Sequence, residues 1–264
     1  MDEHQKQFVK LLEDVSYGHS NVLSDFAEMG ALSIYNAVMP RGGAWHEREK
    51  RYLQIVKGYK KEQMAKICQM LACIVQSFEN GMALSAKAKS SDAVLSSQAM
   101  GIRDVLGEIY MDEKVVSRSR WDSDVAFTPW HVSYMMAQMQ LADFQLPERG
   151  WFRLAEPACG TGGLVIAAAA VINDHTKHNF QRVMHATMVD IRATLAHMAY
   201  IQMSLLHIPA VVIHGDSLSG KEWSRWRTPA HILGFWEGRC PVSIAIPKPP
   251  EGPKVNKKGQ FQMF

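Results

Sequence analysis

Apolar residues recur at helical spacing through the first part of the chain. Phe8, Leu11 and Val15 are three or four positions apart, which places them on one face of an amphipathic helix. A second apolar stripe with the same period covers residues 64–75. Together the two stripes predict a helical amino-terminal region over residues 1–117.

The hydrophobic pattern changes in the second half of the chain, where apolar residues gather in short runs of strand length. Four runs are predicted to be strands: residues 152–155, 183–189, 210–214 and 242–246. Helical stretches over residues 162–173 and 193–206 separate the first three of them. Strands that alternate with helices are typical of parallel βαβ units and a doubly wound sheet. The predicted fold class is therefore α/β, with the sheet in a domain over residues 118–264.

A glycine-rich run joins the first predicted strand to an alanine-rich segment that is typical of a buried helix. Its sequence is Glu156-Pro157-Ala158-Cys159-Gly160-Thr161-Gly162-Gly163. Glycine tolerates positive φ and lets a ligand approach the backbone closely. The free N–H groups at the start of the following helix favour an anionic group. This arrangement predicts a site for a nucleotide-like ligand at the carboxyl ends of the strands.

Three further elements accompany the glycine-rich run. Phe127-Thr128-Pro129 lies upstream, Asp190 closes the second predicted strand, and Asp216 closes the third. With these elements in order, the chain resembles the N6-adenine DNA methyltransferases of bacterial restriction-modification systems, nearest to the methylation subunit of type I systems. Residues 104–110 also look like a segment that those subunits carry ahead of their Phe-Thr-Pro element. The resemblance covers residues 104–250.

The resemblance implies a Rossmann-like methyltransferase domain with S-adenosylmethionine as its cofactor. The Phe-Thr-Pro element matches one that closes over the methionine portion, and Glu156 matches an acidic position that faces the methionine amino group in relatives. Asp190 is placed to accept hydrogen bonds from the ribose hydroxyls. Ile191 is placed to line the adenine pocket, and Asp216 to accept from the adenine amine. The implied cofactor-binding residues are Phe127, Thr128, Pro129, Glu156, Ala158, Gly160, Thr161, Gly162, Asp190, Ile191 and Asp216.

Simpler roles compete with some of these assignments. Asp190 could be a turn residue at the end of a strand, and Asp216 could be a turn residue or a helix cap. Cys159 is interpreted as a small buried residue and not as a nucleophile, because the sequence shows no evident base partner for it. The four cysteines show no metal-ligand spacing, so we predict no metal site.

The catalytic motif departs from the pattern that the resemblance implies. Adenine-amino methyltransferases carry Asn or Asp, then Pro-Pro, then an aromatic residue, after the fourth strand. The first residue accepts hydrogens from the poorly nucleophilic amine, and the aromatic ring stacks on the flipped base. This chain has Lys248-Pro249-Pro250-Glu251. A lysine ammonium accepts no hydrogen bond, and Glu251 offers no stacking face. The catalytic residues are therefore unknown, and weak or no catalysis is expected.

Relatives continue the sheet with three more strands and a target-recognition region. This sequence ends at Phe264, so the resemblance implies a truncated domain whose fourth strand lies at an exposed edge. Because unpaired strand edges invite pairing, we expect a homo-oligomer or a protein partner that covers this edge. The run Trp223-Ser224-Arg225-Trp226-Arg227 suits nucleic-acid stacking, a protein interface or the local core. DNA is accordingly a candidate partner.

Composition adds few limits to this interpretation. The 264 residues suffice for one large domain or two small ones, and the net charge of +3 is too small to indicate a polyanionic partner by itself. The polar amino terminus shows no secretory signal, and the apolar run at residues 163–172 is too short to span a bilayer. A thiol inside the glycine-rich run suits a reducing compartment. We therefore expect a cytoplasmic protein without a membrane partner.

These observations leave three functional hypotheses. The first is a protein of the N6-adenine DNA methyltransferase family that binds S-adenosylmethionine, has weak or no catalysis of its own, and serves a regulatory or defence-related role. The second is an active adenine methyltransferase completed by a partner chain. The third is an interaction protein with a vestigial cofactor pocket.

Overall fold

The structure is a computed structural model, and it describes the greater part of the chain. The described residues are 1–17, 19, 21–89, 101–112 and 127–240. Several predictions fall outside them: the boundary at residue 117, the strand at residues 242–246, and the motif Lys248-Pro249-Pro250-Glu251. None of the described helices combines the length and the apolar character that crossing a membrane requires.

Helices make up the amino-terminal part, as the apolar stripes predicted. Their bounds are α1 (Glu3–Ser16), α2 (Val22–Val38), α3 (Gly43–Val56), α4 (Lys61–Lys89) and α6 (Val105–Tyr110). The first helix begins with a capping box, in which the Asp2 carboxylate accepts from the Gln5 N–H and the Gln5 side chain accepts from the Asp2 N–H. This reciprocal pair satisfies two N–H groups that the helix cannot satisfy itself, and thereby fixes where α1 starts.

The second part of the described chain is an α/β unit, as predicted. Its elements are α8 (Trp130–Gln140), β1 (Phe152–Glu156), α9 (Gly163–His175), α10 (Phe180–Val183), β2 (Met184–Asp190), α11 (Ala193–Leu205), β3 (Ala210–Asp216), β4 (Lys221–Arg227), α12 (Pro229–Leu233) and α13 (Trp236–Arg239). The strands lie in the order β1-β2-β3-β4, and β1, β2 and β3 are parallel. Parallel strands align their carboxyl ends, so Glu156, Asp190 and Asp216 end at the same edge of the sheet.

The fourth described strand corrects the sequence analysis. A purely parallel sheet was expected, and residues 223–227 were left without a secondary structure, but they lie in β4, which runs antiparallel to β3. The Asp216 carboxylate accepts hydrogen bonds from the Leu218 N–H and the Ser219 hydroxyl, and Gly220 has a φ of 71°. These contacts build a turn that reverses the chain directly after β3, so the sheet is mixed.

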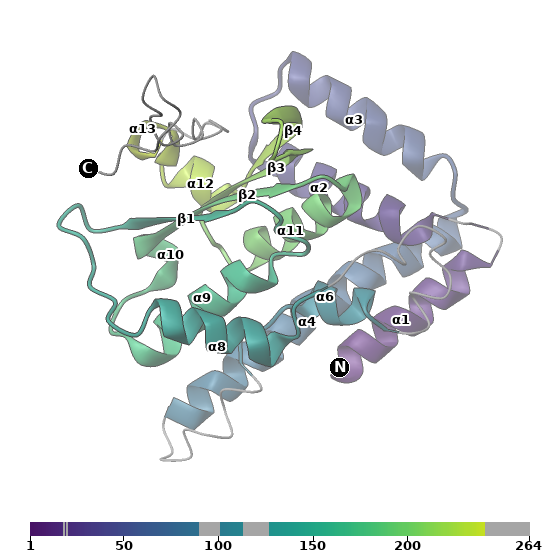
Figure 1. Cartoon of the computed structure of the whole chain (residues 1–264). Coiled ribbons are helices and arrows are strands. Elements are labelled where there is room, and N and C mark those ends of the chain that lie inside the picture. The colour runs from purple at the N-terminus through teal and green to yellow at the C-terminus, as the bar shows by residue number, and fades with distance from the viewer. Residues whose placement is uncertain (18, 20, 90–100, 113–126, 241–264) are drawn as a thin grey trace, which may run out of the picture.

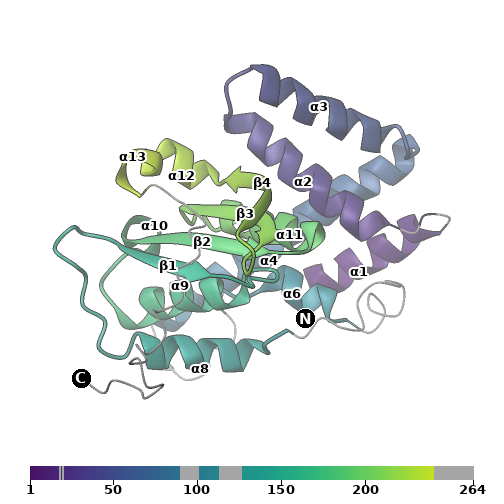
Figure 2. The same ribbon diagram turned by 45° about the horizontal axis from the view of Figure 1, so that its top comes forward.

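Helices cover one face of the sheet. Because β1, β2 and β3 follow one another in space, both connecting helices, α9 and α11, lie on the same face, as Figure 1 shows. Helix α8 packs against α9, and α2 packs against α11 (Figure 2). One hydrophobic core therefore contains Phe8 and Phe26 from the helical region together with Ile166 and Met188 from the α/β unit.

Trp226 connects the sheet to the helical region. Its ring is 4% exposed and lies edge-on to Tyr35 of α2, with ring centroids 5.6 Å apart. It also contacts Tyr200 of α11 at 5.5 Å, and the Arg48 guanidinium of α3 stacks over it at 5.1 Å. Of the roles considered for this tryptophan–arginine run, Trp226 takes the one in the local core. Trp223, three residues earlier, is 44% exposed, and its ring contacts the His214 ring at an interplanar angle of 50°.

Replacing Trp226 by alanine should strongly destabilise the fold. We expect Trp226→Ala to lower the free energy of unfolding by about 3–5 kcal/mol, the usual range for emptying a buried aromatic site. Trp223→Ala on the same strand serves as the control and should cost no more than about 1 kcal/mol. Urea unfolding measures both. Equal losses in the two variants would contradict the core role of Trp226.

A chain of polar groups lies near the opposite end of the strands from the glycine-rich run; its histidines and cysteine are buried, and its glutamate is exposed. The His185 Nε2 and His231 Nδ1 atoms are 2.9 Å apart, and His231 Nε2 is 3.1 Å from a Glu237 carboxylate oxygen. The Cys240 thiol lies 3.5 Å from His185 Nδ1. Burial lowers the pKa of His185 to about 3, and the neighbouring His231 and Arg153 act in the same direction while Glu237 opposes them. Burial also lowers the pKa of His231, and its hydrogen bond to Glu237 opposes this shift. Burial thus favours the neutral form of both rings.

A third buried histidine, His197, lies edge-on to Trp226 with ring centroids 4.9 Å apart. Burial lowers the pKa of His197 to about 4, with Glu28 opposing and His214 and Arg51 acting in the same direction. Neutral buried rings of this kind resist protonation, whereas the same side chains in the unfolded chain take up a proton near pH 6.5. Stability therefore falls as the pH drops below that value.

Acidification should unfold the protein in a histidine-dependent way. We expect the free energy of unfolding to decrease as the pH falls from about 6.5 to about 4, because the unfolded chain binds protons that the folded chain excludes. His197→Phe keeps an aromatic ring against Trp226 and removes the titrating group, so its stability should depend less steeply on pH. Chemical denaturation at several pH values checks this. A variant that parallels the wild type over this window would show that His197 does not contribute.

Candidate functional site

Two glycines of the glycine-rich run have backbone conformations that other residues adopt at a cost. Gly160 has a φ of +54° and Gly162, which caps the start of α9, has a φ of +100°. A Cβ atom on Gly160 would lie 3.2 Å from the Phe127 ring. One on Gly162 would lie 2.9 Å from the Met203 methyl group, beneath the loop. Sterics on both sides therefore restrict these positions to glycine.

Asp190 holds the loop from the end of β2. One carboxylate oxygen accepts from the Gly160 N–H at 2.8 Å, and the other accepts from the Arg192 N–H at 2.8 Å. Burial raises the pKa of Asp190, and these two backbone hydrogen bonds oppose the rise. The strand-end turn role considered for Asp190 is thus present in the structure. Each oxygen retains a lone pair for a further donor, so the predicted ribose contact stays a prediction.

A cavity of about 350 Å³ opens beside this loop. The volume lies in the range of small-molecule sites. It is lined by Asp104, Phe127, Thr128, Ser133, Ala158, Cys159, Gly160, Gly163, Leu164, Asp190, Ile191, Arg192 and Leu195. A second cavity of about 210 Å³ adjoins it and shares Asp104, Phe127, Thr128, Ser133 and Gly163 with it.

The structure brings most, but not all, of the predicted cofactor residues to these cavities. Those that line the larger one are Phe127, Thr128, Ala158, Gly160, Asp190 and Ile191. Pro129 lines the smaller one. The remaining four, Glu156, Thr161, Gly162 and Asp216, line neither. Thr161 and Gly162 instead shape the loop: the Thr161 hydroxyl donates to Asp104, and Gly162 has a positive φ.

Glu156 and Asp216 take local roles in the described structure. Glu156 accepts from the Ala158 N–H at 3.2 Å, and Asp216 builds the turn before β4. The hydrogen bonds that Asp216 receives from Ser219 and Leu218 lower its pKa. For Asp216 this matches the turn role that the sequence left open. Contact of either residue with a cofactor stays a prediction.

Cys159 is a buried residue of the cavity wall. It is 7% exposed, and its thiol lies 3.5 Å from the Gly160 carbonyl oxygen. Burial raises the pKa of this thiol well above its ordinary value, and Asp190 and Glu156 act in the same direction. A thiol that resists ionisation is a poor nucleophile, which agrees with the interpretation of Cys159 as a small buried residue.

One cavity residue that the sequence analysis did not single out is Asp104. Its carboxylate accepts from the Thr161 hydroxyl at 2.7 Å, from the Gln202 amide at 2.7 Å and from the Gly107 N–H at 2.8 Å. Burial raises its pKa, and these three hydrogen bonds oppose the rise. The segment at residues 104–110 was noted as a resemblance, but no apolar period or motif chemistry indicated that Asp104 would reach the glycine-rich loop.

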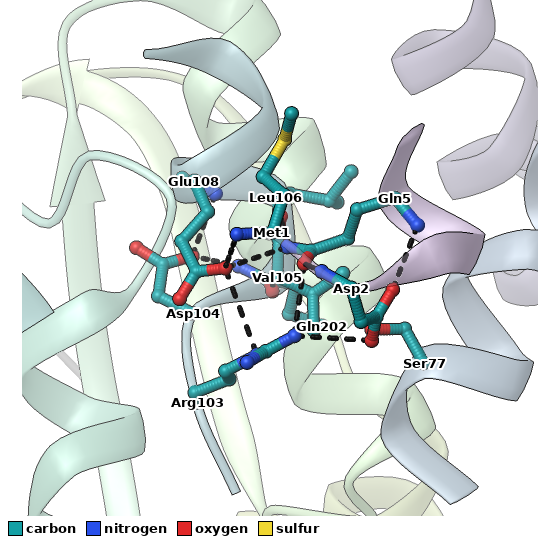
Figure 3. A network of polar contacts seen from close by, with 11 residues as sticks. Met1, Asp2, Gln5, Ser77, Arg103, Asp104, Val105, Leu106, Glu108 and Gln202 are labelled. Atoms are coloured by element: carbon teal, nitrogen blue, oxygen red, sulfur yellow. Dashed lines mark hydrogen bonds and ion pairs between the residues drawn. The ribbon is translucent and has the colours of Figure 1, made fainter. Parts of the chain in front are cut away.

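A polar network continues from Asp104 to the start of the chain (Figure 3). Next to Asp104, Arg103 donates to the Asp2 carboxylate at 3.0 Å and to the Gln5 side chain at 2.9 Å. Gln5 is fully buried and donates in turn to the Glu108 carboxylate at 2.8 Å. The loop beside the cavity is thus hydrogen-bonded through α6 to the amino-terminal end of α1.

Comparison with known proteins gives a family match to the part of the chain that carries this site. The model of the N-6 DNA methylase family matches residues 102–234, which is half of the chain. No curated protein matches the chain. One solved structure that it resembles is described as a class I S-adenosylmethionine-dependent methyltransferase from Listeria monocytogenes. That likeness has 15% identity and a TM-score of 0.40, and covers 90% of this chain and 70% of the other.

Filling the space above Gly160 should abolish ligand binding at the larger cavity. We expect Gly160→Val to lose any thermal shift with S-adenosylmethionine, because the side chain would meet Phe127 and strain the loop. Gly150→Val is the matched control: Gly150 also has a positive φ, of 77°, but a Cβ there meets nothing within 4 Å. Both variants bear the cost of about 1–2 kcal/mol for a left-handed residue. Retained binding in Gly160→Val would contradict this geometry.

Proposed function

This chain belongs to the N-6 DNA methylase family, whose cofactor is S-adenosylmethionine, and we propose that it binds this cofactor at the glycine-rich loop with weak or no catalysis of its own. The cavity beside the loop is the observation that carries the proposal. Its volume of about 350 Å³ is in the range of small-ligand sites, and polar and apolar groups of several elements converge on it.

The residues around the cavity fit the chemistry of this cofactor. Asp190 has lone pairs left to accept from ribose hydroxyls. The amino-terminal end of α9, at Gly163 and Leu164, favours an anionic group such as the methionine carboxylate. Ile191 is 62% exposed at the cavity and offers an apolar surface for the adenine ring. When bound, the cofactor supplies an electrophilic methyl group; these residues would hold and orient it.

The proposal of weak or no catalysis is supported by the chemistry of Lys248 and Glu251, which lie outside the described residues. Where the family pattern has an amide or carboxylate before Pro-Pro, this chain has Lys248, and where the pattern has an aromatic residue it has Glu251. An ammonium group cannot accept hydrogens from the adenine amine, and it repels the cationic sulfonium. A carboxylate cannot stack on a flipped base. Both replacements remove functions that transfer to adenine needs.

The biological role that we propose is regulatory or defence-related, within a restriction-modification setting. An active enzyme completed by a partner chain is the second candidate, because a partner could supply the acceptor that Lys248 lacks. An interaction protein with a vestigial pocket is the third. DNA contact, a homo-oligomer or protein partner, and a cytoplasmic location belong to the same proposal. The location is supported by the four cysteines, which are free thiols.

Cofactor binding without methyl transfer is the expected behaviour of the isolated chain. In calorimetry the wild type should bind S-adenosylmethionine, and Asp190→Ala should weaken binding by about 1–3 kcal/mol through the loss of charge-assisted hydrogen bonds. With a labelled methyl group and mixed-sequence DNA, no incorporation above background is expected over a long incubation.

Each result separates the candidates. Absence of heat with millimolar cofactor would contradict binding and favour the vestigial pocket. Incorporation that scales with protein and depends on Asp190 would contradict weak catalysis. Incorporation only after a partner is added would favour the completed enzyme.

A further inference from the structure

Asp104 is a buried carboxylate without a counter-ion in the described structure. It is 9% exposed, and its three hydrogen-bond donors, Thr161, Gln202 and Gly107, are all neutral. Within the described residues no Lys, Arg or His forms an ion pair with it. Burying an ionised carboxylate is costly unless a cation or several hydrogen bonds compensate, and here only hydrogen bonds do.

The charged residues near Asp104 in the sequence, Arg103 and Glu108, do not supply the missing cation. Arg103, the preceding residue, forms its ion pairs with Asp2 at 3.0 Å and Glu108 at 3.6 Å. Glu108 is itself an anion and disfavours a second negative charge at Asp104. Hydrogen bonds from neutral groups, and no cation of the described structure, therefore compensate the carboxylate of Asp104.

Asp104 also faces the site where a ligand would lie. It lines both adjoining cavities, and its Oδ2 atom would lie only 2.8 Å from a Cβ placed on Gly163, at the start of α9. Asp190 and Ile191 line only the larger cavity. A ligand that extends from Asp190 and Ile191 in the larger cavity toward the smaller cavity therefore reaches the residues that both cavities share, Asp104 among them.

We propose that Asp104 is a cofactor-binding residue whose carboxylate pairs with the α-ammonium group of the methionine portion of S-adenosylmethionine. This inference rests on the proposed function, since it names a contact of the same cofactor site. The ammonium is chosen over the sulfonium because it donates hydrogen bonds, and Asp104 Oδ2 is an acceptor with one donor, Thr161.

The assignment differs from the one that the family resemblance implies. The resemblance places Glu156 opposite the methionine amino group, but Glu156 accepts from its own loop at Ala158 and lines neither cavity. Asp104 is the capping residue at the start of α6, which precedes the Phe-Thr-Pro element in the chain. The counter-charge for the cofactor would thus come from the helical region and not from the glycine-rich run.

The test compares three ligands that share the adenosine part. S-adenosylmethionine carries the sulfonium and the ammonium, S-adenosylhomocysteine carries only the ammonium, and 5′-methylthioadenosine carries neither. We expect Asp104→Asn, which keeps the shape and one acceptor oxygen, to weaken the first two by roughly tenfold to hundredfold, the loss of a charge-assisted hydrogen bond. Affinity for 5′-methylthioadenosine, measured by calorimetry, should stay within about twofold of the wild type.

Two matched variants complete the design. Asp190→Asn makes the same chemical change at another residue that lines the larger cavity. It should weaken all three ligands by the same factor, because they share the ribose. Glu156→Gln should cause no selective loss. If Asp104→Asn does not fold, Asp104→Ser retains a side chain that can accept from the Gly107 N–H at the start of α6 and lacks the charge.

Several results would overturn the proposal. An equal loss for all three ligands in Asp104→Asn would assign Asp104 a structural role, and no loss would exclude the ion pair. A selective loss in Glu156→Gln alone would return the role to Glu156, and a loss for S-adenosylmethionine alone would indicate the sulfonium. Wild-type protein that binds none of the three would contradict the proposed function itself.

Discussion

The hydrogen bonds that converge on Asp104 are the contact on which the rest of this structure depends. Thr161 from the glycine-rich loop, Gln202 from α11 and Gly107 from α6 all donate to one buried carboxylate. The Gln202 amide also donates to the Thr161 carbonyl and accepts from the Leu106 N–H, so its polar atoms are all engaged. Buried networks of this kind are stable only when every member is satisfied. These hydrogen bonds therefore hold the glycine-rich loop, α11 and α6 in one arrangement.

This arrangement explains how an amino-terminal helical region contributes to a site in the α/β unit. The network continues through Arg103 and Gln5 to the first turn of α1 (Figure 3), while Trp226 joins the sheet to Tyr35 of α2 and Tyr200 of α11. Hydrogen bonds thus hold the glycine-rich loop against the helical region, and aromatic packing holds the sheet against it. Both act on α11, the helix that lies between the sheet and α2.

Sequence patterns predicted the elements better than their contacts. The spacing of apolar residues predicted the helical region and three parallel strands, and the glycine content predicted the loop. Each of these is a local property of the chain. The strand at Lys221–Arg227 was missed because its tryptophans and arginines do not alternate as a half-buried strand would. Asp190 was found at a strand end, but its bonds to the Gly160 and Arg192 N–H groups were not. Asp104 lies 57 residues before Thr161 in the chain, and no local pattern reports a contact over that distance.

Hydrogen–deuterium exchange on the full chain, with and without saturating S-adenosylmethionine, tests this coupling most directly. If the loop and the helical region form one hydrogen-bonded unit, the cofactor should slow exchange in the loop and also in Val105–Tyr110, whose N–H groups bond to Asp104 and Gln202. Slower exchange confined to the loop and the end of β2, with Val105–Tyr110 unchanged, would contradict the account.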